Sequence, residues 1–120
     1  MDAVLIADDD ALVRSVLRAA LERRGVPVAE AGNGDELLAL LDEADYGLCI
    51  MDARMPGATL QTRLDRLRDV APSLPVIVLT GFAEERNTAG RPGVRFARKP
   101  IDLGALDTVL AEAALSGAER

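Results

Sequence analysis

The chain contains no histidine and no tryptophan, and it has a single cysteine, Cys49, among its 120 residues. Without histidine it can form neither a catalytic triad with an imidazole base nor a histidine-ligated zinc site, and it cannot carry a phosphohistidine. One cysteine excludes an internal disulfide. Because Cys49 lies in the apolar segment 48–51, we expect a buried, inert thiol in a reducing compartment, the cytoplasm. Chemistry that needs imidazole must therefore come from a partner.

Aromatic residues and long apolar runs are also scarce. Tyr46, Phe82 and Phe96 are the only aromatic side chains, so the core must be built from Leu, Val, Ile and Ala. No segment approaches the roughly 20 apolar residues of a membrane span, and we expect no membrane insertion. The net charge of −6, from 20 acidic and 14 basic residues, gives no electrostatic support for direct binding of nucleic acid.

What the chain does have is a regular alternation of short apolar runs and amphipathic segments. The apolar runs predict buried strands at 4–8, 26–30, 46–51, 75–80 and 94–97. The amphipathic segments predict helices at 11–24, 35–43, 60–70 and 103–113, the last one capped by Asp102, with a fraying tail at 116–120. A further helix at 83–89 is short or degenerate because it has almost no apolar face. The alternation predicts one α/β domain over 1–120, with an ordered core of about 3–115 and a parallel sheet covered on both faces.

The first predicted helix has a clear apolar stripe. It consists of residues at helical spacing, namely Val13, Val16, Leu17, Ala20 and Leu21. We expect this stripe to face the sheet, and we expect Gly25 to end the helix.

Polar side chains stand at the ends of four predicted strands. Asp8 and Asp9 follow the first strand, Asp52 the third, Thr80 the fourth and Lys99 the fifth. The carboxyl ends of parallel strands meet at one edge of a sheet, where open α/β sheets bind their ligands. We therefore expect these five side chains to converge.

Crowded carboxylates repel one another, so they either hold protons at pH 7 or share a cation. Oxygen donors without histidine or paired thiols suit Mg²⁺, which we expect Asp9 and Asp52 to hold, with Asp8 acting through water and a backbone carbonyl completing the shell. Asp10 is expected to cap the following helix. A carboxylate needs no base to act as a nucleophile, and aspartyl phosphate is a known intermediate, so the pattern indicates phosphoryl transfer supported by the metal and Lys99.

Four ordered motifs resemble the receiver domain of two-component response regulators. They are Ala7-Asp8-Asp9, Met51-Asp52-Ala53-Arg54-Met55-Pro56, Leu79-Thr80-Gly81 and Arg98-Lys99-Pro100. The resemblance spans essentially the whole chain and implies a flavodoxin-like, doubly wound (βα)5 fold with strand order 2-1-3-4-5. It also implies a phosphoacceptor domain of a phosphorelay, whose partner is a sensor histidine kinase or a histidine phosphotransfer protein. Such a domain is no enzyme beyond its own phosphorylation and dephosphorylation.

By this resemblance Asp52 is the phosphoacceptor. Asp9, Asp52 and the backbone carbonyl of Arg54 bind Mg²⁺, with Asp8 contributing through water and with Mn²⁺ or Ca²⁺ as substitutes.

The resemblance also implies a switch. Thr80 is the switch hydroxyl, Phe96 is the switch aromatic, and Lys99 is the lysine that contacts the phosphoryl group. The peptide bond between Lys99 and Pro100 is expected to be cis. Arg54 lies two positions after Asp52, and Phe82 lies two positions after Thr80. Side chains at these positions can overhang the phosphoryl group, so we expect both to modulate its hydrolysis.

Two departures from the family pattern stand out. After Met55-Pro56 the usual acidic residue and glycine are missing, so we expect this loop to differ. The interval from Thr80 to Lys99 is short at the expense of the helix at 83–89, which leaves dimerisation open. The shortened segment resembles the receivers attached to hybrid histidine kinases.

Two alternatives belong to other classes. A haloacid-dehalogenase-like phosphatase would use Asp8 as the nucleophile of an Asp-x-Asp motif, with Thr80 and Lys99 in support, but such enzymes do not need Asp52. A pure interaction module would keep the fold without being phosphorylated.

Overall fold

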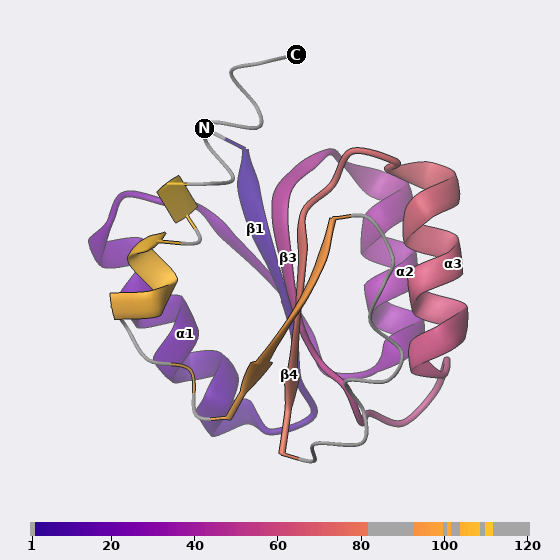
Figure 1. Ribbon diagram of the computed structural model, residues 1–120, viewed down its shortest axis with the longest axis horizontal. Helices are drawn as coiled ribbons and strands as arrows, with labels where there is room; N and C mark the ends of the chain where they lie inside the picture. The colour runs from indigo at the N-terminus through magenta and orange to yellow at the C-terminus, as the bar shows by residue number, and fades with distance from the viewer. Residues whose placement is uncertain (1, 82–92, 100, 102–103, 109, 112–120) are drawn as a thin grey trace.

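The computed structural model, which describes residues 2–81, 93–99, 101, 104–108 and 110–111, contains one parallel sheet with helices against both faces (Figure 1). The strands are β1 (Ala3–Ala7), β2 (Val28–Ala31), β3 (Tyr46–Asp52), β4 (Val76–Thr80) and β5 (Val94–Arg98). The helices are α1 (Ala11–Arg23), α2 (Gly34–Glu43) and α3 (Leu60–Val70), and residues 104–108 and 110–111 are also helical. The strand order β2-β1-β3-β4-β5 confirms the predicted flavodoxin-like fold.

The sheet separates two apolar layers because alternate residues of each buried strand face opposite sides. On the side of α2 and α3, the core contains Leu5, Cys49 and Val78, with Leu64 from α3. On the side of α1 and the C-terminal helical residues, it contains Ile6, Ile50, Leu79, Leu17 and Leu106. Figure 1 shows the same division, with α1 on the left of the sheet and α2 and α3 on the right.

The helices α1, α2 and α3 each begin after a residue that sequence chemistry favours as an N-cap, namely Asp10, Asn33 and Thr59. The side chain of Asp10 accepts the N–H of Leu12 at 2.9 Å, which confirms the predicted cap of α1. Asn33 caps α2 in the same way by accepting the N–H of Glu36 at 2.8 Å. Gly25, at φ 74°, lies just beyond α1 in the left-handed conformation that glycine adopts freely.

Two local predictions were wrong. The second strand begins at Val28 rather than Val26, because Val26 still donates its N–H to the Leu21 carbonyl at 3.1 Å as part of the turn after α1. Val16 was expected in the buried stripe of α1 but is 55% exposed, because the buried stripe runs through Leu17, Ala20 and Leu21.

Cys49 is buried in β3, as predicted, and burial raises the pKa of its thiol to about 12. None of the helices in the described ranges is both long and apolar enough to cross a bilayer. The expected helix at 83–89, the Asp102 cap, Pro100 and the tail at 116–120 lie outside the described residues.

The loop after β3 lies against the start of α2. The N–H of Gly34 donates to the Pro56 carbonyl at 2.9 Å, and a Cβ at Gly34 would lie 2.6 Å from the carbonyl oxygen of Ala58. Gly57 has φ 88°, and a Cβ there would lie 2.8 Å from a carboxylate oxygen of Asp35. The two glycines therefore allow a close backbone approach that holds this loop beside the sheet edge.

Candidate functional site

The carboxyl ends of β1, β3, β4 and β5 meet at one edge of the sheet, as the parallel topology requires. Asp8 follows β1, Asp52 ends β3 and Lys99 follows β5. Backbone hydrogen bonds align these ends, since the N–H of Ala53 donates to the Leu79 carbonyl at 2.8 Å and the N–H of Lys99 to that of Thr80 at 3.1 Å. Side chains that are far apart in the sequence are thus presented from neighbouring strands.

Three carboxylates gather at this edge. One oxygen from each of Asp8, Asp9 and Asp52 lies within 4.8 Å of the others. Asp8 is 1% exposed and Asp52 is also buried, whereas Asp9 is exposed. The cluster therefore combines two carboxylates that have lost most of their water with a third that solvent can reach.

The ammonium of Lys99 lies between the two buried carboxylates. Its Nζ is 2.9 Å from Asp8 Oδ2 and 3.0 Å from Asp52 Oδ2. Burial alone lowers the pKa of Lys99, but hydrogen bonds and charge from Asp8 and Asp52 more than compensate, so the pKa is raised overall. One ammonium thus forms ion pairs with two carboxylates, while Asp9 adds a third carboxylate to the cluster. The cluster therefore holds more carboxylates than Lys99 can neutralise.

The charge of Asp52 is poorly stabilised despite this contact. Burial raises the pKa of Asp52, and the neighbouring Asp8 raises it further, against the opposing effects of Lys99 and of the N–H of Arg54. That N–H lies 3.3 Å from Asp52 Oδ1. Additional positive charge at this position would therefore be favourable.

The donor chemistry of the cluster fits Mg²⁺. All candidate ligands are oxygens, and Asp8 Oδ2 contacts Lys99 but receives no well-aligned hydrogen bond from any residue that the structure describes. A buried carboxylate oxygen without such a bond suits a water molecule of a hydrated cation. Asp9 and Arg54 also line a shallow hollow of about 420 Å³ beside the cluster. Asp9, Asp52 and, through water, Asp8 are thus the residues that could hold the ion.

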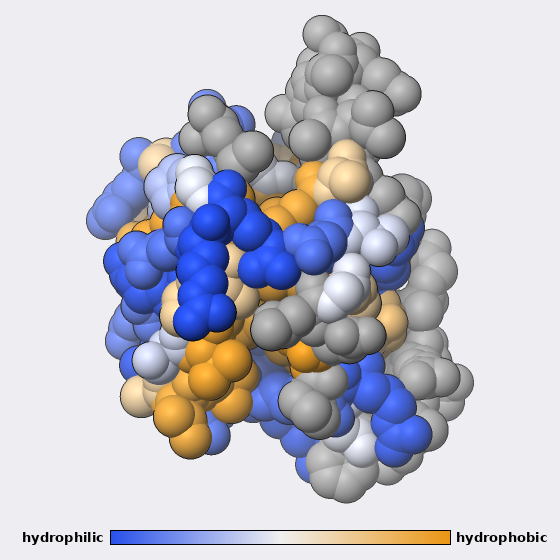
Figure 2. Space-filling view, turned by 90° about the vertical axis from the view of Figure 1, so that its left-hand side faces the viewer, coloured by the Kyte–Doolittle hydropathy of each residue, from blue (hydrophilic) through white to orange (hydrophobic). Residues whose placement is uncertain are grey.

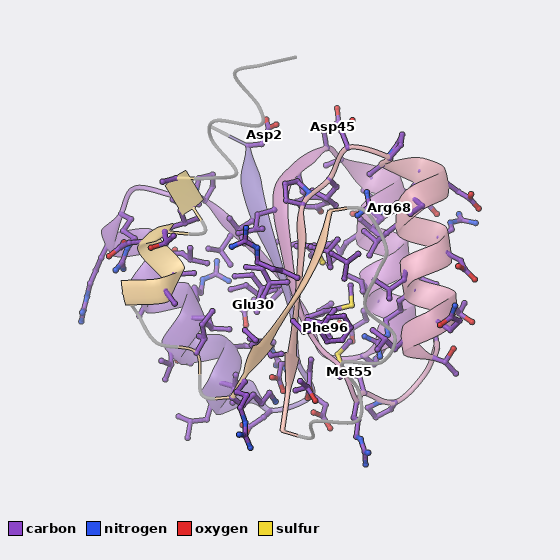
Figure 3. All side chains as sticks on the ribbon, viewed as in Figure 1. Asp2, Glu30, Asp45, Met55, Arg68 and Phe96 are labelled. Carbon is purple, nitrogen blue, oxygen red and sulfur yellow. The ribbon has the colours of Figure 1, made fainter. Side chains whose placement is uncertain are left out.

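The remaining predicted site residues have different surroundings. Thr80 is buried at the end of β4. Phe96 is half-buried in β5, opposite Val78, and packs on the α2 and α3 side of the sheet, where Figure 3 labels it together with Met55. Arg54 is exposed, whereas Phe82 lies outside the described residues.

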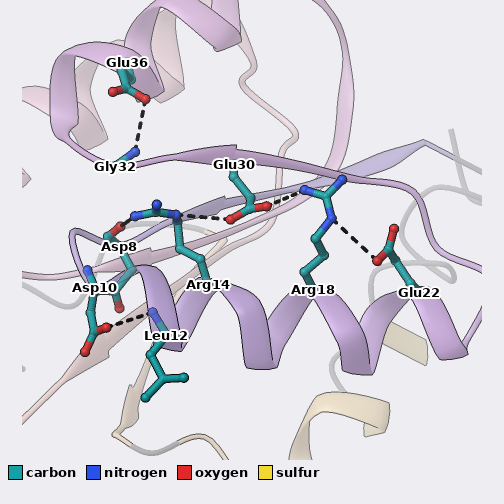
Figure 4. Close-up of polar contacts among 9 residues, drawn as sticks. All are labelled: Asp8, Asp10, Leu12, Arg14, Arg18, Glu22, Glu30, Gly32 and Glu36. Carbon is teal, nitrogen blue, oxygen red and sulfur yellow. Dashed lines mark hydrogen bonds and ion pairs between the residues drawn. The ribbon is translucent and has the colours of Figure 1, made fainter.

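Two arginines that the sequence reasoning missed bind the backbone of the acidic residues. Arg14 Nη1 of α1 donates to the Asp8 carbonyl at 2.6 Å, and its Nε donates to Glu30 Oε1 at 3.1 Å. Figure 4 shows this chain of contacts, which continues through the Glu30–Arg18 pair. On the other face of the sheet, Arg63 Nη1 of α3 donates to the Asp52 carbonyl at 2.9 Å. A charged residue inside the Leu60, Leu64 and Leu67 stripe was the available signal for Arg63.

This combination defines a class, namely a doubly wound α/β domain with a lysine and a cluster of three carboxylates at its carboxyl edge. Comparisons with known proteins agree. The family model for the response regulator receiver domain matches residues 4–111. The chain is 35% identical over 121 residues to the DNA-binding transcriptional regulator NtrC of a Bradyrhizobium species, covering 98% of this chain and 25% of that protein.

Solved structures show the same similarity. The receiver domain of the hybrid histidine kinase CckA superposes with a TM-score of 0.79 at 32% identity, over 92% of this chain and 97% of that one. The response regulator TrrA of Thermotoga maritima, in a complex with Mg²⁺ and BeF, shares the fold at a TM-score of 0.83 and 24% identity, over 94% of this chain and 99% of that one. The chain belongs to the response regulator receiver family and is a phosphoacceptor domain of two-component signalling. It spans 25% and 35% of the length of two curated relatives, NtrC and ResD of Bacillus subtilis.

The raised pKa of Asp52 predicts that Asp52→Asn stabilises the metal-free protein at pH 7, measured as a higher free energy of unfolding than that of the wild type. The folded state holds the Asp52 proton more tightly than the unfolded state does, so ionising it costs stability. The gain should shrink as the pH falls through the raised folded pKa and should vanish below the unfolded value of about 3.9. Urea unfolding in EDTA between pH 3 and 8 measures it.

The matched control is Asp69→Asn, since Asp69 is an exposed residue of α3. Its stability should follow that of the wild type at every pH. A destabilised Asp52→Asn protein at pH 7 would contradict this account of the site.

Proposed function

We propose that Asp52 accepts a phosphoryl group from a phosphohistidine of a sensor histidine kinase or a histidine phosphotransfer protein. The observation that carries the proposal is the convergence of Asp8 and Asp52 on the single ammonium of Lys99, with Asp9 beside them. The histidine must come from the partner because this chain has none.

In the proposed reaction, a carboxylate oxygen of Asp52 attacks the phosphorus, the phosphorus–nitrogen bond breaks, and the electron pair returns to the imidazole of the partner. Asp9, Asp52 and the backbone carbonyl of Arg54 would hold Mg²⁺, or Mn²⁺ or Ca²⁺ in its place, with Asp8 acting through water. The bound cation supplies positive charge that the transferred oxygens need. The ammonium of Lys99 would give up one of its two carboxylate contacts and would contact a phosphoryl oxygen instead.

The same proposal assigns the response to Thr80 and Phe96. The Thr80 hydroxyl would hydrogen-bond the phosphoryl group, and this inward pull would bias the packing of Phe96 between two arrangements. The exposed Arg54 side chain and Phe82 would modulate hydrolysis. The domain acts only on its own phosphorylation and dephosphorylation. We also propose a cytoplasmic location, for which the free thiol of Cys49 is the support.

The phosphatase alternative fits less well. As a nucleophile, Asp8 would have to react while 1% exposed, with Oδ1 accepting the N–H of Asp10 at 2.9 Å and Oδ2 against Lys99. The comparisons with known proteins give that alternative no support.

Incubation with radiolabelled acetyl phosphate and Mg²⁺ should label the wild type at one site, with the base lability of an acyl phosphate. Asp52→Asn should abolish this labelling because it removes the nucleophile, whereas Asp69→Asn should leave it unchanged. Stoichiometric labelling that persists in Asp52→Asn and disappears in Asp8→Asn would overturn the assignment in favour of the phosphatase.

An apolar groove of about 410 Å³ adjoins the site on the α1 side. Its lining comprises residues of α1, β4 and the segment after β5, namely Leu12, Val13, Val16, Leu17, Leu79, Lys99 and Ile101. Leu12 is 71% and Val16 is 55% exposed. Figure 2 views this side of the molecule and shows an apolar patch at its lower left. We propose that a helix of the phosphohistidine partner docks here, because the groove shares Lys99 with the site that the imidazole must reach.

Val16→Asp should lower the rate of phosphotransfer from a histidine donor by about tenfold, because it places a charge in an apolar contact. The donor is the fastest one found by profiling the phosphorylated kinases and phosphotransfer proteins of the source cell. Labelling by acetyl phosphate should be unchanged, since it needs no docking.

The matched control is Val70→Asp, because Val70 is also exposed, at 41%, but lies at the far end of α3. It should transfer at the wild-type rate. Equal rates for Val16→Asp and the wild type would refute the docking surface.

A further inference from the structure

Arg63 is a fully buried cation directly behind the phosphoacceptor. It lies on the inner face of α3 and is 1% exposed. Its guanidinium donates to three backbone carbonyls, those of Asp52 at 2.9 Å, Ala53 at 2.8 Å and Ala58 at 3.0 Å. Its remaining polar partner among the described residues is the sulfur of Met51, at 3.2 Å. Each of these four partners therefore belongs to the end of β3 or to the loop that follows it.

No carboxylate of the described residues forms an ion pair with Arg63, unlike Arg14, which is paired with Glu30 at 3.1 Å. Burial lowers the pKa of Arg63, and the charge of Asp52 acts against that shift. A buried guanidinium without a carboxylate partner is costly, and its hydrogen bonds to carbonyl dipoles offset part of the cost. Such a residue calls for a role beyond packing.

The hydrogen bonds of Arg63 fix the two peptide groups that directly precede Arg54, whose backbone carbonyl is the proposed metal ligand. Arg63 binds the carbonyls of Asp52 and Ala53 with two nitrogens of one rigid, planar fork. From the opposite side, the N–H of Ala53 donates to the Leu79 carbonyl at 2.8 Å. Because peptide groups are planar, only the two backbone dihedrals of Arg54 remain to orient its carbonyl.

The same guanidinium also holds the far end of this loop. Its Nε donates to the Ala58 carbonyl, which lies where a Cβ at Gly34 would collide with it. The loop of residues 53–58 is thus bound at both ends by one side chain and is backed by the start of α2.

We propose that Arg63 is a positioning residue for the cation site, holding the 53–58 loop so that the Arg54 carbonyl and the Asp52 carboxylate face one ion. This inference rests on the proposed function. It assigns Arg63 to the backbone and not to the phosphoryl group, since its bonds are to carbonyl oxygens.

Two substitutions distinguish the effect of Arg63 on the position of the 53–58 loop from the effect of its positive charge. Arg63→Lys keeps the positive charge but cannot bond to three carbonyls as the planar fork does, whereas Arg63→Met removes the charge and retains an apolar volume. If Arg63 acted only through its charge, its removal would strengthen binding of a cation. Positioning predicts the opposite, with both variants binding more weakly.

The measurement is the dissociation constant of Mg²⁺ alone, by calorimetry at a temperature well below unfolding. We expect it to rise about tenfold in Arg63→Met and several-fold in Arg63→Lys, the scale at which support of a metal ligand acts. In metal-free protein, amides of residues 53–58 should exchange hydrogen faster than in the wild type, while those of β1 stay protected. The matched control is Leu67→Ala, a buried change on the same helix, which should lower thermal stability without changing Mg²⁺ affinity.

Mg²⁺ affinity within twofold of the wild type in both Arg63 variants, or tighter binding in Arg63→Met, would overturn the inference. If Leu67→Ala lowered the Mg²⁺ affinity as much as Arg63→Met does, the inference would also be overturned, because general destabilisation would then explain the weaker binding. Failure of the wild type itself to bind Mg²⁺ would instead defeat the proposed function. If Arg63→Met does not fold, Arg63→Lys carries the test alone.

Discussion

The contact of one ammonium with two buried carboxylates is the interaction on which this site depends. Lys99 Nζ lies 2.9 Å from Asp8 and 3.0 Å from Asp52, and it draws together the ends of strands that are remote in sequence. The contact leaves negative charge in excess, because Asp9 belongs to the same cluster. Such an imbalance of charge would be relieved by a divalent cation, and in the proposed function that cation would let the site accept a phosphoryl group that carboxylates alone would repel.

The backbone around these carboxylates is held from both faces of the sheet. Arg14 of α1 binds the carbonyl of Asp8, and Arg63 of α3 binds that of Asp52. The first arginine is balanced by Glu30, whereas the second is buried among carbonyls. Each helix therefore contributes to the precision of the site as well as to the core beneath it.

Much of this arrangement could be predicted from the sequence. Continuous apolar runs that end on acids, a threonine and a lysine indicate buried parallel strands whose ends meet, and the approach of Asp8, Asp52 and Lys99 agrees with that prediction. The strand order was predicted from the resemblance to receiver domains, and it also agrees. The place of Arg63 in the leucine stripe of α3 indicates that it lies on the buried face, but periodicity cannot show that three backbone carbonyls surround its guanidinium. The prediction that Val16 belongs to the buried stripe of α1 was wrong for a related reason, because helical spacing alone does not show how wide a buried stripe is.

The most direct test of the central claim is a crystal structure of this chain with Mg²⁺ and beryllofluoride, which mimics a phosphoryl group on a carboxylate. The account predicts beryllofluoride on Asp52, within contact of Lys99 and the Thr80 hydroxyl, and one Mg²⁺ held by Asp9, Asp52 and the Arg54 carbonyl. Beryllofluoride on Asp8, or a metal that does not contact Asp52, would contradict it.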